Sequence, residues 1–133
     1  MTEANDPSRE HILIVEDDKD LRDTLREALE LEGYLAVSVE NGRAALRHLA
    51  TGAKPCMILL DLMMPVMDGW TFRQELLKDR ELAAIPVIVM TAATAARAAA
   101  VASHAVLYKP LHMGRVIDVV QEHCPYGRDG LLS

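Results

Sequence analysis

The chain has 133 residues, of which half are hydrophobic and 26% are charged, as is usual for a single globular domain. Acidic residues outnumber basic ones by 20 to 14, so the net charge is −6. A protein that binds nucleic acid without regard to base sequence needs a basic surface, so this balance argues against such a function. The longest apolar runs have only about five or six residues, far fewer than a membrane-spanning helix requires.

The two ends of the chain differ in composition from its middle. Residues 1–10 are polar and acidic, unlike a secretion signal, and residues 125–133 contain two glycines. We therefore expect flexible tails at 1–10 and 125–133 around one domain at 11–124. The two cysteines, Cys56 and Cys124, are expected to be free, reduced thiols of a cytoplasmic protein, with a structural disulfide as the minor alternative.

Short apolar runs alternate with amphipathic runs along this domain. The expected strands are at 11–15, 35–39, 57–60, 87–90 and 105–108. The expected helices are at 21–29, 41–52, 68–77, 92–102 and 113–120. Asn41 and Asp68 stand where side chains cap the start of a helix, while Gly33 and Gly52 stand where helices end.

Strands that are apolar on both faces and alternate with helices are typical of a parallel sheet with helices on both sides. We therefore predict a doubly wound α/β fold with five parallel strands in the flavodoxin-like order 2-1-3-4-5. In such folds the functional site lies beyond the carboxyl ends of the strands.

Four of the five predicted strands end in side chains that could take part in chemistry. These are Glu16 and Asp17 after the first strand, Asp61 after the third, Thr91 after the fourth and Lys109 after the fifth. Carboxylates that converge on one point repel each other, and a hard divalent cation such as Mg²⁺ relieves that repulsion. A carboxylate beside such an ion and a lysine can attack phosphorus and form an aspartyl phosphate.

Four stretches give the sequence a clear resemblance to a known family. They lie, in order along the chain, at residues 12–18 (ILIVEDD), 57–69 (MILLDLMMPVMDG), 87–92 (VIVMTA) and 108–110 (YKP). Each motif alone is weakly specific, but the ordered set resembles the receiver domains of response regulators in two-component signalling. The resemblance covers residues 12–110.

The resemblance implies a role for each matching acidic residue. Asp61 corresponds to the phosphoacceptor, and Glu16 and Asp17 correspond to the pair that holds Mg²⁺ (or Mn²⁺), with Asp17 as the more direct ligand. Asp61 itself and the backbone carbonyl of Met63 complete the metal ligands that the family implies.

The remaining matches concern the phosphoryl group and the nearby turns. Thr91 corresponds to the switch hydroxyl, with Ala92 directly after it, and Lys109 corresponds to the lysine that pairs with phosphate. Met63 and Ala92 flank the path of an attacking water, and the bulk of Met63 is expected to slow dephosphorylation. Turn positions of the family are matched by Pro65, Asp68, Gly69 and Pro110, and the peptide bond before Pro110 is expected to be cis.

Three departures from the family fall between Thr91 and Lys109. Val106 stands where the family often has an aromatic switch residue, and the aromatic Tyr108 is expected to point to the other face of its strand. Only 17 residues separate Thr91 from Lys109, which is about one helical turn fewer than usual. We therefore expect a short or irregular fourth helix. The third departure is Ser103-His104-Ala105 in place of a common Gly-Ala.

The sequence thus predicts a phosphorelay receiver that accepts a phosphoryl group on Asp61 from a sensor histidine kinase or a histidine phosphotransferase. It is expected to signal by conformational change and to catalyse only its own phosphorylation and dephosphorylation, so it is not an enzyme in the usual sense. Its unknown downstream target is expected to bind the face made by the fourth helix, fifth strand and last helix, with no direct nucleic-acid contact and no membrane insertion.

Three other functions compete with this prediction. The strongest is a receiver-like interaction module that works without phosphorylation, which the altered segment after Thr91 suggests. A phosphatase of the haloacid-dehalogenase type needs a second aspartate two residues after the first, where this chain has Met63. A mononucleotide-binding flavodoxin-like protein would be disfavoured by the acidic loop after the first strand. The chain ends soon after the last helix, so an output domain is expected to be absent or to belong to a longer protein.

Overall fold

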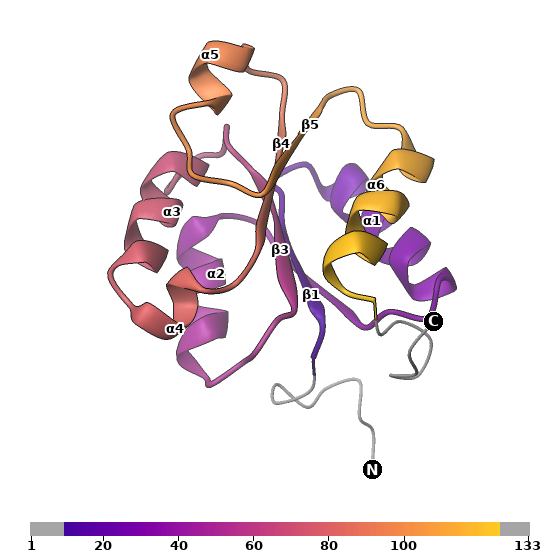
Figure 1. Ribbon diagram of the computed structural model, residues 1–133, viewed down its shortest axis with the longest axis horizontal. Helices are drawn as coiled ribbons and strands as arrows, with labels where there is room; N and C mark the ends of the chain where they lie inside the picture. The colour runs from indigo at the N-terminus through magenta and orange to yellow at the C-terminus, as the bar shows by residue number, and fades with distance from the viewer. Residues whose placement is uncertain (1–9, 126–133) are drawn as a thin grey trace.

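The computed structural model describes residues 10–125, which form five strands and six helices (Figure 1). The strands are β1 (Ile12–Val15), β2 (Ala36–Val39), β3 (Met57–Asp61), β4 (Val87–Thr91) and β5 (Ala105–Tyr108). The helices are α1 (Lys19–Leu31), α2 (Gly42–Ala50), α3 (Gly69–Leu77), α4 (Arg80–Ala83), α5 (Ala95–Ala98) and α6 (Met113–His123). The tails expected at 1–10 and 125–133 lie outside the described residues except for Glu10 and Pro125. In the described part of the chain, no helix has the length and apolar composition needed to cross a membrane.

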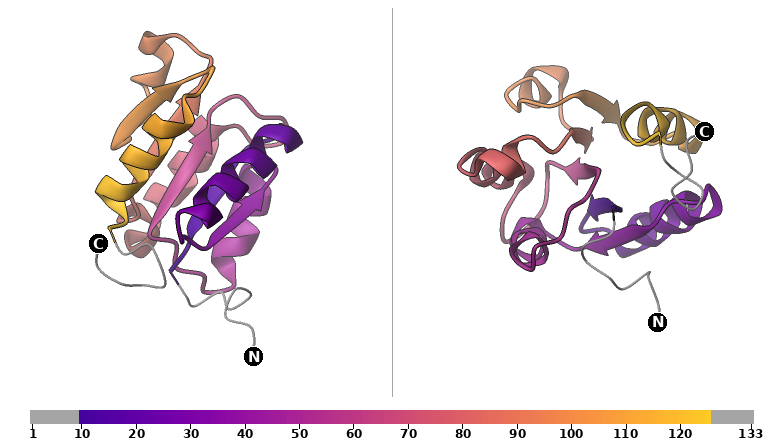
Figure 2. Two further views of the ribbon diagram at one scale, coloured as in Figure 1. Left: turned by 90° about the vertical axis from the view of Figure 1, so that its right-hand side faces the viewer. Right: turned by 60° about the horizontal axis from the view of Figure 1, so that its bottom comes forward.

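The strands form one parallel sheet in the order β2-β1-β3-β4-β5, which confirms the predicted fold. Helices cover both faces, with α1 and α6 on one side and α2, α3 and α5 on the other (Figure 2). The three central strands are fully buried because both faces of the sheet are covered. Their side chains alternate between the two hydrophobic clusters, so adjacent residues of one strand serve opposite layers.

Side-chain caps begin the three helices that follow β1, β2 and β3. Asp18 accepts hydrogen bonds from the backbone at the start of α1, Asn41 does so for α2, and Asp68 does so for α3. The caps predicted at Asn41 and Asp68 are therefore confirmed. The short helix α4 was not expected, although Asp79 caps it in the same way through two backbone N–H groups.

The segment between β4 and β5 contains only the single-turn helix α5, which confirms the predicted short fourth helix. Side chains of α3 hold this segment in place. The indole Nε1 of Trp70 donates to the carbonyl of Arg97 at 3.2 Å, and the guanidinium of Arg97 lies 4.6 Å from the centre of the indole ring. The Nε of Arg73 donates to the carbonyl of Ala102 at 2.8 Å. These contacts join α3 to a segment that has few large side chains of its own.

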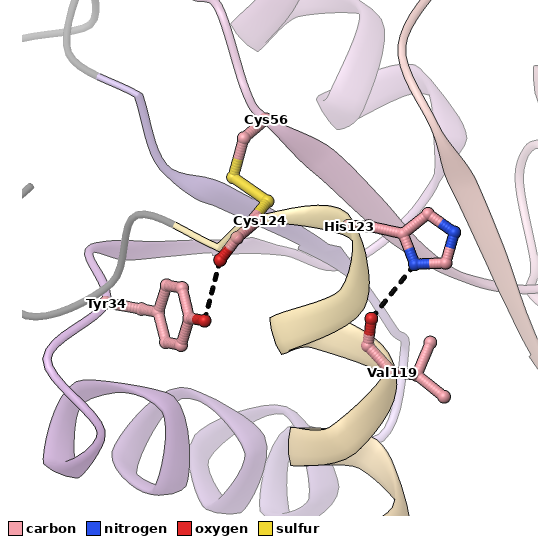
Figure 3. The surroundings of a disulfide bond; sticks show 5 residues. All are labelled: Tyr34, Cys56, Val119, His123 and Cys124. Carbon is pink, nitrogen blue, oxygen red and sulfur yellow. Dashed lines mark hydrogen bonds between the residues drawn. A yellow bond between two sulfur atoms is a disulfide. The ribbon is translucent and has the colours of Figure 1, made fainter. Parts of the chain in front are cut away.

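The prediction of free cysteines is wrong, because Cys56 and Cys124 form a disulfide (Figure 3). Their Cα atoms are 6.0 Å apart although 68 positions separate them in the sequence. Cys56 immediately precedes β3 and Cys124 follows α6, and the packing of α6 across the sheet brings both to the same end of the molecule. The hydroxyl of Tyr34 donates to the carbonyl of Cys124 at 2.7 Å, which fixes the same end of α6.

Candidate functional site

The register of the sheet brings the predicted site residues together at its carboxyl edge. Val15 pairs with Leu60, so Glu16 lies beside Asp61. Thr91 pairs with Tyr108, so Lys109 lies one position beyond Thr91. Glu16, Asp61 and Thr91 are all buried, with at most 2% of their surface exposed. Four separate strand ends therefore contribute to one polar cluster at an edge of the apolar sheet.

Lys109 bridges two of the buried carboxylates. Its Nζ lies 2.8 Å from Oε1 of Glu16 and 3.4 Å from Oδ2 of Asp61. Asp17 is exposed and lies on the outer side of the cluster. One carboxylate oxygen from each of Glu16, Asp17 and Asp61 falls within 4.8 Å of the other two. Three carboxylates and one ammonium leave the cluster with a negative charge, which suits a divalent cation with a preference for oxygen ligands.

The surroundings of Asp61 raise the pKa of its carboxyl to about 7. Burial is the largest cause, the charge of Glu16 adds to it, and the ammonium of Lys109 acts in the opposite direction. Because the folded-state pKa lies above the ordinary value of 3.8, folding favours the protonated form. Its contribution to stability is fully present below about pH 4 and is lost as the pH rises through about 7.

Lys109 keeps its charge in this environment. Burial lowers the pKa of its ammonium, but the hydrogen bond to Glu16 and the charges of Asp61 and Glu16 outweigh burial, so the net pKa lies above the ordinary value. The cluster therefore combines a cationic ammonium with one carboxyl that changes its protonation near neutral pH.

The loop between β1 and α1 is held by contacts that the sequence did not suggest. The Oε2 atom of Glu16 accepts from the backbone N–H of Asp18 at 3.0 Å, so the buried carboxylate has a partner on each oxygen. The guanidinium of Arg22 donates to the carbonyls of Glu16 and Asp17 at 2.9 and 3.3 Å. Arg22 therefore positions the acidic loop from the first turn of α1. Only its place one turn after the Asp18 cap could have indicated this role.

The loop after β3 packs closely against the backbone of Asp61. The N–H of Gly69 donates to the carbonyl of Leu62 at 2.9 Å, and a Cβ on Gly69 would lie 2.6 Å from the carbonyl oxygen of Asp61. Glycine is therefore required here for close packing. The N–H of Met67 donates to the carbonyl of Pro65 at 2.8 Å, and the N–H of Met63 donates to Oδ1 of Asp61 at 3.2 Å.

Val66 in this loop adopts a left-handed backbone conformation with φ of 70° and has 74% of its surface exposed. A β-branched residue is disfavoured there, whereas asparagine tolerates that conformation. We expect Val66→Asn to raise the free energy of unfolding by about 1 kcal/mol in urea titrations. Val66→Ile, which keeps the branch, is the matched control and should bring no gain. Equal stabilities of the two variants would contradict the prediction.

Three further predicted residues lie at or just after the ends of β3 and β4. The hydroxyl of Thr91 accepts from the N–H of Ala93 at 2.9 Å, Ala92 is exposed, and Met63 is half-exposed. The peptide bond between Lys109 and Pro110 is cis, as predicted.

The expectation that Tyr108 points to the other face is wrong. Residues two apart in a strand share a face, so Tyr108 lies on the same face as Val106, which packs with the α2, α3 and α5 layer. Leu107 between them packs into the opposite cluster. Tyr108 is half-exposed. The aromatic residue of β5 is one residue before Lys109, whereas the family pattern has it three residues before.

Comparison with known proteins decides the family. The response regulator receiver domain family matches residues 12–121. The chain belongs to this family. It is thus a receiver domain of two-component signalling, and its fold and acidic cluster agree with that assignment.

Several known proteins are similar to this receiver. The DNA-binding dual master transcriptional regulator RpaA of Synechocystis is 42% identical over 81 residues, which cover 61% of this chain and 33% of RpaA. Protein PilH of Pseudomonas aeruginosa is 39% identical over 80 residues, which cover 60% of this chain and 65% of PilH. The chain spans about a third of the length of the transcriptional regulators that it matches.

Solved structures show the same architecture. The receiver domain of a signal transduction histidine kinase from Syntrophus aciditrophicus matches with a TM-score of 0.80 and 31% identity, over 86% of this chain and 89% of that one. The receiver domain of a sensor histidine kinase from Pseudomonas aeruginosa matches with a TM-score of 0.77 and 25% identity, over 86% and 96% of the two chains. That structure is described with a magnesium ion coordinated in its active-site cleft.

Proposed function

We propose that this receiver takes a phosphoryl group from a phosphohistidine onto Asp61, in a reaction that depends on Mg²⁺. The donor is a sensor histidine kinase or a histidine phosphotransferase. The observation that carries the proposal is the position of the Asp61 carboxyl, which is buried at the carboxyl edge of the sheet with the Lys109 ammonium between it and Glu16. A buried nucleophile with a fixed cation beside it is suited to phosphoryl transfer.

The residues of the cluster fit Mg²⁺ (or Mn²⁺) by the chemistry of their donor atoms. Glu16, Asp17 and Asp61 offer hard carboxylate oxygens, and the carbonyl of Met63 is the backbone ligand that we propose with them. The magnesium ion described for the Pseudomonas aeruginosa receiver supports this assignment. When bound, the metal supplies neutralisation of the negative charge on the phosphoryl oxygens.

The protein groups then share the work of the transfer. A carboxylate oxygen of Asp61 attacks phosphorus, the P–N bond to the donor imidazole breaks, and the electron pair of that bond remains on the imidazole nitrogen. The Lys109 ammonium faces the oxygens of the transferred group and offsets their charge. The Thr91 hydroxyl donates a hydrogen bond to one of them. The same groups support hydrolysis of the acyl phosphate, so the receiver catalyses only its own reactions.

The signal is proposed to pass through the face made by α5, β5 and α6 to a protein target. Val106 and Tyr108 lie on β5 and the short α5 is tied to α3, so this face differs from the family pattern where the readout is expected. We propose a cytoplasmic location, as expected for a partner of histidine kinases, and binding to protein rather than to nucleic acid.

Phosphoryl incorporation from acetyl phosphate tests this function. Intact mass should show a gain of one phosphoryl group with Mg²⁺ and no gain with a chelator. The competing function, an interaction module that works without phosphate, predicts no gain and no response to beryllofluoride with Mg²⁺. That result would overturn the proposal.

Mg²⁺ binding should depend on pH because the metal and the proton compete for Asp61. With the pKa of Asp61 at about 7, the ionised fraction rises about tenfold between about pH 6 and pH 8. We therefore expect the dissociation constant for Mg²⁺ to fall about tenfold over this range, measured by calorimetry. The Asp61→Asn variant should bind more weakly and lose most of the pH dependence. An unchanged affinity across the range in the wild type would contradict this prediction.

A further inference from the structure

A second reactive group lies at the opposite end of β3 from the acidic cluster. The Cys56–Cys124 disulfide sits directly before β3, whereas Asp61 ends that strand. The bond is therefore separate from the proposed phosphorylation site. Figure 3 shows that it joins the start of β3 to the residue that follows α6, next to the hydrogen bond from Tyr34 to Cys124.

A surface pocket gives access to this bond. The pocket has a volume of about 510 Å³, and its lining includes Glu10, Lys54, Pro55, His123 and both cysteines. This volume lies within the range of sites that hold small molecules. The two cysteines differ in exposure, because Cys56 is partly exposed whereas Cys124 has only 4% of its surface exposed.

We propose that Cys56–Cys124 is a reversible thiol–disulfide exchange site that takes small thiols, such as a thiol tripeptide, in this pocket. The thiolate of the small thiol attacks Sγ of Cys56, the Cys56–Cys124 bond breaks, and its electron pair leaves on Sγ of Cys124, which takes a proton from water. The thiolate of a second small thiol then attacks the small-thiol sulfur of the mixed disulfide, that S–S bond breaks, and its electron pair leaves on Sγ of Cys56, which takes a proton from water. The products are two protein thiols and one disulfide of the small thiol, so two electrons pass to the protein.

The assignment of attack to Cys56 rests on its exposure. Cys56 is partly exposed whereas Cys124 is buried, so we assign the first attack to Cys56. When the bond is formed, it attaches the end of α6 to the start of β3, and reduction removes this attachment. The buried face of α6 packs against the sheet through Val116, Val119 and Val120. After reduction, the end of α6 keeps this packing and the Tyr34 hydrogen bond but loses its covalent attachment to β3.

The test measures the reduction of the full chain by reduced glutathione, with and without urea. Samples are quenched with an alkylating reagent, and intact mass counts the free thiols. We expect the rate in native buffer to lie within about tenfold of the rate in urea, because the pocket exposes the bond in the folded state. Peptide mapping of an early quench should find glutathione on Cys56. Returning the protein to oxidised glutathione should restore the bond.

Two results would overturn the proposal. A bond that reacts only through global unfolding would be reduced about 10³-fold or more slowly in native buffer than in urea. Glutathione trapped on Cys124 instead of Cys56 would contradict the assigned direction of attack. The Cys56→Ser/Cys124→Ser double variant is the blank for the mass shifts. The assay mixture contains no phosphodonor and no Mg²⁺. A negative result for thiol exchange is therefore independent of a negative result for the proposed phosphorylation.

Hydrogen exchange supplies a second readout that does not depend on the rate of reduction. In the reduced protein, the amides of the last turn of α6 should exchange about tenfold faster through local opening, and this exchange should depend little on low urea concentrations. If these amides instead followed the urea dependence of the β4 amides, they would exchange only through global unfolding, which would contradict the local role.

Discussion

Replacing Lys109 with methionine is expected to lower the free energy of unfolding by about 3 kcal/mol and to slow phosphorylation at least about 100-fold. The Glu16 carboxylate is completely buried, and the Lys109 ammonium 2.8 Å away is the cation that balances its charge. Removing the ammonium leaves the buried Glu16 carboxylate without its cationic partner, and an unpaired buried charge strongly destabilises the folded state. The substitution also removes the cation that we propose to face the transferred phosphoryl group.

Lys78 provides a matched control for this substitution. Its Nζ lies 2.7 Å from Oε2 of Glu75, which is as close as the Lys109 contact, but Lys78 is exposed. Exposed ion pairs contribute little, so Lys78→Met should change the free energy of unfolding by less than about 0.5 kcal/mol and leave phosphorylation unchanged. Urea titration and acetyl phosphate kinetics measure both effects. Similar losses for the two variants would show that burial of the cluster is not what matters.

Removing the Cys56–Cys124 disulfide should have an effect of similar size on stability alone. The bond closes a loop across 68 positions, and the chain-entropy relation gives about 4 kcal/mol for a loop of that length. We therefore expect the reduced wild type to unfold at a clearly lower urea concentration than the oxidised protein. The reason is that the reduced chain gains conformational freedom when it unfolds.

The Cys56→Ser/Cys124→Ser variant separates the bond from other effects of the reductant. Its stability should match that of the reduced wild type to within about 1 kcal/mol and should not change when reductant is added. A loss of less than about 1 kcal/mol on reduction of the wild type would show that the bond adds little to the fold. The test requires no phosphorylation and therefore concerns the scaffold only.

The acidic cluster could be predicted because it depends on a local property of each strand. Every apolar run that became a central strand ends in a polar residue, and parallel strands bring their carboxyl ends to one edge. Glu16, Asp61 and Lys109 therefore meet even though the chain places them far apart. Their mutual distances and the raised pKa of Asp61 depend on burial, which the sequence pattern does not contain.

The disulfide could not be predicted in the same way. Cys56 and Cys124 carry no local signal of pairing, and their contact results from the packing of α6 across the sheet. The absence of a recognisable secretion signal favoured free thiols, but that argument concerns cellular location and not geometry. The contacts from Trp70 and Arg73 to the α5 segment have the same origin, because they join residues that only the tertiary fold brings together.

The short helix α5 could be predicted in part. The sequence indicated its shortness through the distance between Thr91 and Lys109, and the structure confirms one turn at Ala95–Ala98. The face on which Tyr108 lies was predicted wrongly, although the two-residue period of a strand was sufficient to place it beside Val106.

Phosphoryl transfer to Asp61 can be tested by intact mass after treatment with acetyl phosphate and Mg²⁺. Three proteins are compared: the wild type, Asp61→Asn and Asp68→Asn. Asp68 is the matched control, because it lies in the same loop region but caps α3, a role that asparagine also fills. We expect a gain of one phosphoryl group in the wild type and in Asp68→Asn, and no gain in Asp61→Asn. A full gain in Asp61→Asn, or no gain in the wild type, would contradict phosphorylation of Asp61.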